Sequence, residues 1–322
     1  MRVLITGGMG VIGAEASRKF VREGHRPVIF ARHRDETLIG DILDKVDIEL
    51  GSILDRARLA EVIKRRGVTH VVHTAAYISA LSAAHPAESV EINVMGTVNV
   101  LEAARAAQVE RVVYTSAKGV YGPFLGEYGA PTYKPVTEDH PKEPKRIYDS
   151  AKLMGEHATL YWASLGLDVV VLRFATTYGP GKTARHGNMG VTSQIVENPA
   201  NGLPFRIAQG GDEKDDFIYN KDSALGIYLA TVTKNPGSRV FNIGSGVGIT
   251  LKDVAQVLRR HLPQAVIEIG PGLNFLGSPY PMHGVYDISR AQRELGYRAE
   301  FDLERGIADY LESLARLKMR AA

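Results

Sequence analysis

A tyrosine and a lysine stand four residues apart in the stretch IYDSAK at positions 147–152. On a helix, Tyr148 and Lys152 would lie on the same face. A phenol has an ordinary pKa of about 10, and a neighbouring ammonium favours the phenolate and lowers that pKa. Such a phenol can exchange a proton with a substrate oxygen while the carbon that bears this oxygen gains or loses a hydride. Because the spacing also occurs by chance, its meaning depends on the elements that position it.

Short runs rich in β-branched residues alternate with helical patterns in the first half of the chain. One helical pattern, at 86–107, keeps the apolar period of a helix. This alternation predicts an α/β fold, a doubly wound parallel sheet with helices on both faces. The predicted strands cover residues 3–6, 28–31, 70–74, 111–116 and 169–173.

After about Thr176 the pattern becomes irregular and rich in glycine, yet 224–233 and 239–243 look like a helix and a strand of the first sheet. We therefore expect two interleaved domains. Residues 1–175 plus about 222–245 would form the dinucleotide-binding domain, and residues 176–221 plus 246–322 would form a smaller α/β domain for the substrate.

Three glycines follow the first predicted strand and open a helical run in the stretch LITGGMGVIG. Gly7, Gly10 and Gly13 would allow a tight turn, a close approach of the backbone to a pyrophosphate, and packing of the helix on the strand. The helix N-terminus would offer free N–H groups to the phosphates. In this context the motif predicts the dinucleotide-binding turn of a Rossmann sheet.

The end of the second predicted strand bears on the choice of cofactor. NAD sites usually carry an acidic residue there, which holds the ribose 2′-hydroxyl. This chain has Ala31 at that place, followed by Arg32 and Arg34. A guanidinium suits a 2′-phosphate, so NADP is favoured and NAD is the alternative. The other interpretation is that both arginines only solvate a loop.

Nine stretches along the chain form a recognisable set of motifs: TGGMGVIG (6–13), GSILD (51–55), HTAA (73–76), NVMGTVNVLEAA (93–104), TSAKGVYG (115–122), YDSAK (148–152), LRFATTYGPG (172–181), VFNIGSG (240–246) and YDISRAQRELGY (286–297). Taken together, these motifs resemble the extended short-chain dehydrogenase/reductase family, also called NAD-dependent epimerase/dehydratases. This resemblance implies a Rossmann fold, chemistry on a bound nicotinamide, and a homodimer formed by pairing of long helices.

The resemblance also implies roles for single residues, and Lys152 would hold the nicotinamide ribose as well as tune Tyr148. Asn93 would support the architecture of the active site. The other implied cofactor contacts are Gly7, Gly10, Val11, Ile12 and Gly13 at the pyrophosphate, Ile53 near the adenine, Ala75 and Ala76 along the cofactor, and Phe174 against the nicotinamide.

The chain departs from this family at a residue that should bond the substrate oxygen. In the family a Ser or Thr lies five residues before the glycine of a Tyr-Gly pair, and here that position is Ala117. Losing such a donor costs about 10²–10³ in rate, so another hydroxyl is expected to replace it. We nominate Ser116, which would reach the substrate if the strand ends in a twist or bulge. Further candidates are Thr115, Lys118 and Thr176.

A second departure concerns the substrate. Family members that bind nucleotide sugars often carry an arginine where this chain has Asp215, in the stretch DDFIYN. The acids at 212, 213, 215 and 216 would repel a diphosphate. We expect a small hydroxy or keto substrate instead, although Lys182, Arg185 and His186 could bind an anion from another direction. Lys118 and Gly119 stand where 4,6-dehydratases carry Asp-Glu, so that elimination is not expected.

The composition limits the kinds of partner and binding site that the protein can have. The chain has 322 residues, 44% of them apolar, and its net charge of +3 is spread along the sequence, so no nucleic-acid partner is expected. No cysteine occurs, which removes thiolate metal sites and fits a reducing cytoplasm. No apolar run approaches 18 residues and no metal-binding motif is present, so neither a membrane span nor a metal is expected.

Three functions remain open. The first is an NADP-preferring oxidoreductase that acts on a secondary alcohol or ketone, with Tyr148 as acid/base, Lys152 beside it and Ser116 orienting the substrate. The second is a sugar or nucleotide-sugar epimerase that retains NAD. The third, suggested by Ala117, is a non-catalytic protein that senses a dinucleotide.

Overall fold

The central feature of this computed structural model is a parallel sheet of seven strands, and the structure describes residues 1–186 and 190–317. The strand order is β10-β6-β5-β4-β1-β2-β3, and each neighbouring pair is parallel. The predicted doubly wound parallel sheet is therefore confirmed. Its strands are β1 (Val3–Thr6), β2 (Val28–Ala31), β3 (Asp47–Leu50), β4 (His70–His73), β5 (Arg111–Ala117), β6 (Val169–Phe174) and β10 (Val240–Ile243).

The sequence located the buried strands but not the edge strand β3. All six residues of β6 are buried, as expected for a strand covered on both faces. In β3, acidic residues alternate with apolar ones, which hid the strand from the sequence analysis. Glu49 of β3 is buried and forms ion pairs with Arg58, Arg65 and Arg66.

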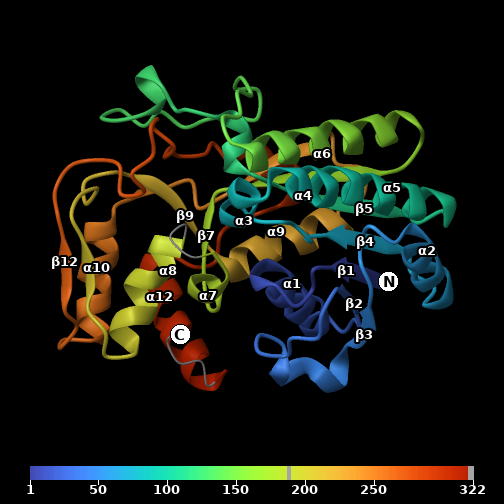
Figure 1. Cartoon of the computed structure of the whole chain (residues 1–322), viewed down its shortest axis with the longest axis horizontal. Helices are drawn as coiled ribbons and strands as arrows, with labels where there is room; N and C mark the ends of the chain where they lie inside the picture. The colour runs from blue at the N-terminus through green and yellow to red at the C-terminus, as the bar shows by residue number, and fades with distance from the viewer. Residues whose placement is uncertain (187–189, 318–322) are drawn as a thin grey trace.

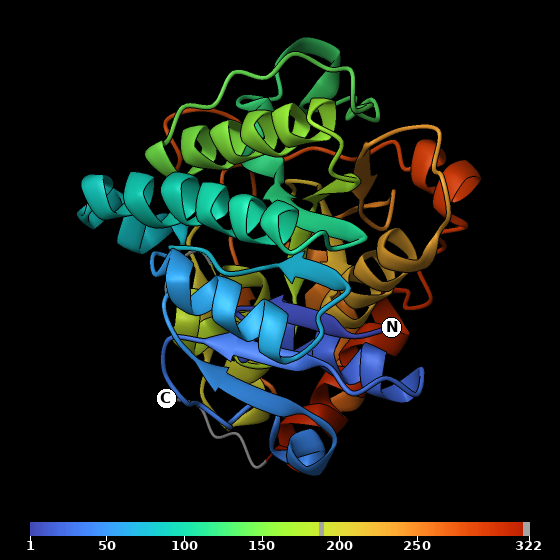
Figure 2. The ribbon, with the colours of Figure 1, turned by 90° about the vertical axis from the view of Figure 1, so that its right-hand side faces the viewer.

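Helices cover both faces of this sheet (Figure 1). On one face lie α2 (Arg56–Arg65), α3 (Ser79–Ala84), α4 (Pro86–Val90), α5 (Gly96–Ala106) and α6 (Ile147–Ser164), and on the other lie α1 (Val11–Arg22), α9 (Asn220–Val232) and α11 (Ser289–Leu295). Figure 2 shows α5 and α6 side by side above the sheet. The predicted helix at 86–107 is interrupted by a π-helical turn, Glu91–Met95.

A second group of elements lies beside the carboxyl ends of the central strands, on the left of Figure 1. Its core contains Tyr178, Tyr219 and Tyr310. It has a three-stranded sheet of β7 (Thr176–Tyr178), β9 (Asp215–Tyr219) and β11 (Gly248–Ile249), and a pair formed by β8 (Phe205–Ile207) and β12 (Ile267–Ile269). Its helices are α7 (Lys182–His186), α8 (Val191–Ala200), α10 (Leu251–His261) and α12 (Leu303–Arg316). Within the described residues, no helix is long and apolar enough to cross a membrane.

Candidate active site

A cavity of about 640 Å³ lies at the carboxyl ends of the central strands. It spans the point between β1 and β4 where the strand order reverses, which is where ligands bind in open α/β sheets. Its size suits a cofactor or small-molecule site. Of the residues that the sequence nominated as catalytic or cofactor-binding, all except Asn93 line this cavity: Gly7, Gly10, Val11, Ile12, Gly13, Arg32, Ile53, Ala75, Ala76, Ser116, Tyr148, Lys152 and Phe174.

The glycine turn leaves no room for side chains. Gly7 has a φ of +69°, which L side chains rarely adopt, and a Cβ on it would lie 2.8 Å from the backbone of Ala75. A Cβ on Gly13 would lie 2.2 Å from the carbonyl oxygen of Gly7. The backbone can therefore come close to a ligand at the start of α1, so these residues fit the pyrophosphate of a dinucleotide.

Asn93 does not line the cavity but forms hydrogen bonds with a residue of its wall. It lies in the π-helical turn and is buried, and its side-chain oxygen accepts from the backbone N–H of Tyr77 at 2.7 Å. Its amide nitrogen donates to the carbonyl oxygen of Tyr77 at 2.9 Å. Because Tyr77 lines the cavity, Asn93 holds part of the wall in place rather than contacting its interior.

At the end of β2 the first charged side chain that lines the cavity is the guanidinium of Arg32. Ala31, Arg32 and His33 line it, whereas Arg34 lies outside and pairs with Glu36. Within residues 1–186 and 190–317, the side chain of Arg32 forms no ion pair and no hydrogen bond. Asp35, the next acid along the chain, lines the cavity but is paired with Arg185.

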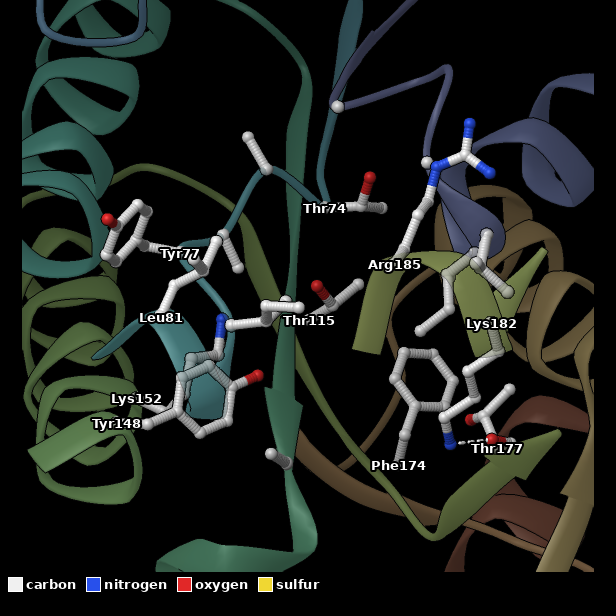
Figure 3. A pocket seen from close by; sticks show the side chains of 18 of the residues that line it. Thr74, Tyr77, Leu81, Thr115, Tyr148, Lys152, Phe174, Thr177, Lys182 and Arg185 are labelled. Carbon is white, nitrogen blue, oxygen red and sulfur yellow. Dashed lines mark hydrogen bonds between the residues drawn. The ribbon is translucent and has the colours of Figure 1, made fainter. Parts of the chain in front are cut away.

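Tyr148 and Lys152 extend from the first turns of α6 into the cavity (Figure 3). The Lys152 ammonium lies 4.2 Å from the ring centroid of Tyr114, and burial lowers the pKa of Lys152 to about 7, against the opposing effect of Glu156. Burial also raises the pKa of Tyr148, and the charge of Asp149 raises it further. The prediction of a lowered phenol pKa is therefore wrong for this arrangement, because burial and Asp149 together outweigh the opposing charge of Arg146.

Ser116 contacts a group that the sequence analysis did not consider. Its hydroxyl donates to the carboxylate of Glu156, which is only 1% exposed. The same carboxylate forms an ion pair of 2.7 Å with Arg173. Because this contact uses the hydroxyl proton, the structure does not support the prediction that Ser116 presents it to a substrate. Thr115 is also engaged, since its hydroxyl donates to the carbonyl oxygen of His73 at 3.0 Å.

Lys118, which follows Ala117, reaches across to the second group of elements. Its ammonium donates to the hydroxyl of Thr176 at 2.8 Å and forms an ion pair with Asp215. Thr176 in turn donates to Asp215 at 2.6 Å. Asp215 is fully buried, and the ammonium of Lys118 neutralises its charge.

The four acids at 212–216 do not form a free acidic patch, because none of them lines the cavity. Asp212 is paired with Lys252, Glu213 with His283 and Asp215 with Lys118. Asp216 is buried and accepts from the backbone N–H groups of Ser245 and Gly246. The structure therefore does not support the expectation that this segment repels a diphosphate in the cavity.

Two pairs of functional neighbours were missed by the sequence analysis. Arg146 is paired with buried Asp149 at 2.6 Å beside Tyr148, and a Cβ on Gly119 would lie 1.9 Å from that carboxylate. Glu156 could have been found, because it continues the helix face of Tyr148 and Lys152 by one turn. Its ion-pair partner on β6, Arg173, could not have been identified from the sequence around it. Among the described residues, no group of three or more His, Asp or Glu is placed to hold a metal ion.

A parallel sheet in this order, a glycine turn at its switch point and a Tyr-x-x-x-Lys pair in the same cavity define a nicotinamide-dinucleotide enzyme of the extended short-chain dehydrogenase/reductase class. The model of the NAD dependent epimerase/dehydratase family matches residues 3–244. The chain belongs to this family, and it is an enzyme with the family's nicotinamide-dependent oxidoreductase chemistry.

Three similar proteins match this chain over almost their whole length. A putative UDP-glucose 4-epimerase of Methanocaldococcus jannaschii is 30% identical over 314 residues, which cover 95% of each chain. The solved UDP-glucose 4-epimerase of Thermus thermophilus with NAD has a TM-score of 0.81 and 26% identity, and covers 98% of this chain and 99% of its own. The enzyme of Thermotoga maritima with UDP-glucose, at 24% identity and a TM-score of 0.84, covers 99% of this chain and 100% of its own and supports the fold.

Proposed function

We propose that this enzyme is an NADP-preferring oxidoreductase that moves a hydride between the nicotinamide and a secondary alcohol or ketone carbon. The observation that carries this proposal is that Tyr148 and Lys152 line the same cavity as the glycine turn. Residues of the central sheet would hold the cofactor, and residues 176–221 and 246–322 would provide most of the substrate contacts.

The roles of the chain's own residues follow from their positions. When bound, the nicotinamide supplies the carbon that exchanges the hydride. Tyr148, whose phenol stays protonated near neutral pH because burial raises its pKa, donates a proton to a ketone oxygen in the reductive direction. The ammonium of Lys152 bonds the nicotinamide ribose and lowers the cost of the phenolate that remains. Ser116 supports α6 through Glu156 instead of touching the substrate.

Tyr148→Phe tests the catalytic assignment. We expect a loss of about 10²–10⁴ in turnover, since the phenol is the proton donor. Turnover is measured as the change in nicotinamide absorbance with a panel of alcohols, hydroxy acids and sugars. Tyr161→Phe is the control, because Tyr161 lies on the same helix but is 60% exposed. Full turnover by Tyr148→Phe would show that the assignment is wrong.

Arg32 supports the choice of NADP, and Arg34 offers a matched control. We expect Arg32→Ala to weaken NADPH binding about 10- to 100-fold, because it removes charge-assisted hydrogen bonds to the 2′-phosphate. NADH binding should stay unchanged, and Arg34→Ala should affect neither. Both affinities are measured by titration of nicotinamide fluorescence. Equal binding of NADH and NADPH by the unmodified protein would contradict the preference.

An epimerase that retains NAD is the second candidate, and it is favoured by the relatives named as UDP-glucose 4-epimerases. Such an enzyme would return the hydride to the same carbon. Cofactor that survives purification, together with epimerised sugar and no net change in nicotinamide absorbance, would select this candidate over the first. Cofactor that exchanges freely and is consumed in proportion to product would select the oxidoreductase.

A homodimer in the cytoplasm is part of the proposal. Large apolar side chains stay exposed on one helical face of the molecule, namely Val90, Met95, Met154, Tyr161 and Leu165. A second copy that covers these side chains would remove them from water. We expect a dimeric mass in light scattering and a monomer after Tyr161→Lys. The absence of cysteine favours a reducing compartment.

A further inference from the structure

The cations that line the cavity are not all balanced by carboxylates. Three of them have an acidic partner: Arg146 with Asp149, Arg185 with Asp35, and Lys118 with Asp215. Among the described residues, Arg32, Lys152 and Lys182 have none. The proposed cofactor accounts for Arg32 through its 2′-phosphate and for Lys152 through its ribose. Lys182 is left without an ion pair to a carboxylate among the described residues.

Lys182 directs its ammonium to the end of the cavity near Phe174 (Figure 3). It donates to the backbone carbonyl of Thr177, and no other hydrogen bond of this ammonium occurs within residues 1–186 and 190–317. Burial lowers the pKa of Lys182 to about 8, and the charge of Lys118 contributes to this decrease. An ammonium has three N–H groups, so two of them remain for a ligand.

Lys118 is held in a fixed position at the same end. Two of its N–H groups go to Thr176 and Asp215, and the third remains. The neighbouring Ala117 pairs with Phe174 in the register of β5 and β6. Lys118 forms the ion pair with buried Asp215, and the charge of the same carboxylate acts on Lys182. Both lysines line the cavity, whereas Asp215 lies behind its wall, so two ammonium groups are present there with one carboxylate.

We propose that Lys118 and Lys182 bind a carboxylate of the substrate, and that the substrate is a hydroxy or keto acid whose carboxylate lies one or two carbons from the reacting carbon. This inference rests on the proposed function, since it takes the end near Phe174 as the place of reaction. The net charge of the cluster, two cations and one anion, matches a monoanion. In a nucleoside diphosphate sugar the phosphates lie across the ring from carbon 4, which is too far from the reacting carbon for this position.

This site also accounts for the departures from the family pattern. Ala117 and Asp215 stand where the family often carries a hydroxyl and an arginine, and both lie next to Lys118, one in sequence and the other as its ion-pair partner. A carboxylate fixed by two ammonium groups would orient the reacting oxygen towards Tyr148 without the hydroxyl missing at Ala117. The substrate would then contribute the anchoring that the chain lacks.

The experiment compares acids with their uncharged esters. Binding of lactate, 3-hydroxybutyrate and methyl galactosiduronate, each against its methyl ester, is measured by calorimetry on the protein saturated with NADPH. These acids carry no aldehyde or ketone, so NADPH cannot reduce them. We expect at least one acid to bind tenfold or more tightly than its ester, because hydrogen bonds to charged groups are strong. If acids and esters bind alike, or if none binds, the proposal is refuted. This comparison needs no variant.

Variants then locate the site. Lys182→Gln should remove the preference for the acid and leave NADPH binding unchanged, whereas Lys214→Gln, an exposed lysine outside the cavity, should retain the preference. A preference retained in Lys182→Gln would overturn the assignment, as would UDP-glucose binding that weakens in this variant. If an acid binds through Lys182 but nicotinamide absorbance never changes, the oxidoreductase proposal fails and the anion site stands. If the protein instead oxidises neutral alcohols and Lys182→Gln does not change this turnover, the oxidoreductase proposal stands and the anion site fails.

Discussion

Replacing Glu156 with glutamine removes the carboxylate that pairs with Arg173 while keeping the shape of the side chain. Both side chains are almost fully buried, at 1% and 5% exposure. Breaking a buried ion pair from one side costs about 3–5 kcal/mol. Arg173 would keep the hydroxyl of Tyr121 at 3.0 Å and the carbonyl of Glu138 at 2.9 Å as neighbours, so the lower end of that range is expected.

The assay is urea unfolding, with Glu102→Gln as the control. Glu102 pairs with Arg56 on the surface, where the side chains are 38% and 63% exposed, and losing such a pair costs about 0–1 kcal/mol. Glu156→Gln should therefore lower the free energy of unfolding by clearly more than the control. If the two variants lose the same amount, the buried pair does not stabilise the protein and the reasoning fails.

The same variant has a functional readout that stability alone would not change. Glu156 raises the pKa of Lys152, whereas burial lowers it to about 7. Without this carboxylate the pKa of Lys152 should fall further, and its ammonium would be lost at a lower pH. We expect the descending limb of kcat/KM against pH to move to lower pH in Glu156→Gln. An unchanged limb would contradict the coupling between Glu156 and Lys152.

Two further predictions concern the sheet and the glycine turn. Burial lowers the pKa of His73 from 6.5 to about 3, so its contribution to stability is complete above pH 6.5 and is lost as the pH falls towards 3. Between pH 7.5 and pH 5.0 the unmodified protein should lose about 2 kcal/mol more unfolding free energy than His73→Gln, at roughly 1.36 kcal/mol for each pH unit below 6.5. Equal losses in the two proteins would show that His73 does not have a lowered pKa in the folded state. Gly13→Ala should abolish NADPH binding in a fluorescence titration, because its Cβ would lie 2.2 Å from the Gly7 carbonyl oxygen. Gly40→Ala, with open space around its Cβ, should bind NADPH normally, and full binding by Gly13→Ala would refute the steric argument.

Much of the fold and the location of the candidate site could be predicted from the sequence. The six predicted strands of the central sheet begin and end within one residue of β1, β2, β4, β5, β6 and β10. Tyr148 and Lys152 share a helix face, and the glycine turn follows β1. These features depend on residues close together in the chain, where the periods of strand and helix decide which side chains share a face.

The contacts within the site were decided only by the tertiary structure. Ser116 bonds Glu156, which lies 40 residues away, and Lys118 pairs with Asp215, which lies 97 residues away. The direction of the Tyr148 pKa shift was likewise set by burial, which no local pattern reports. The physical reason is that these hydrogen bonds and ion pairs join residues far apart in the chain. They form only once the strands have taken their places in the sheet and the second group of elements has packed against the carboxyl ends of the strands.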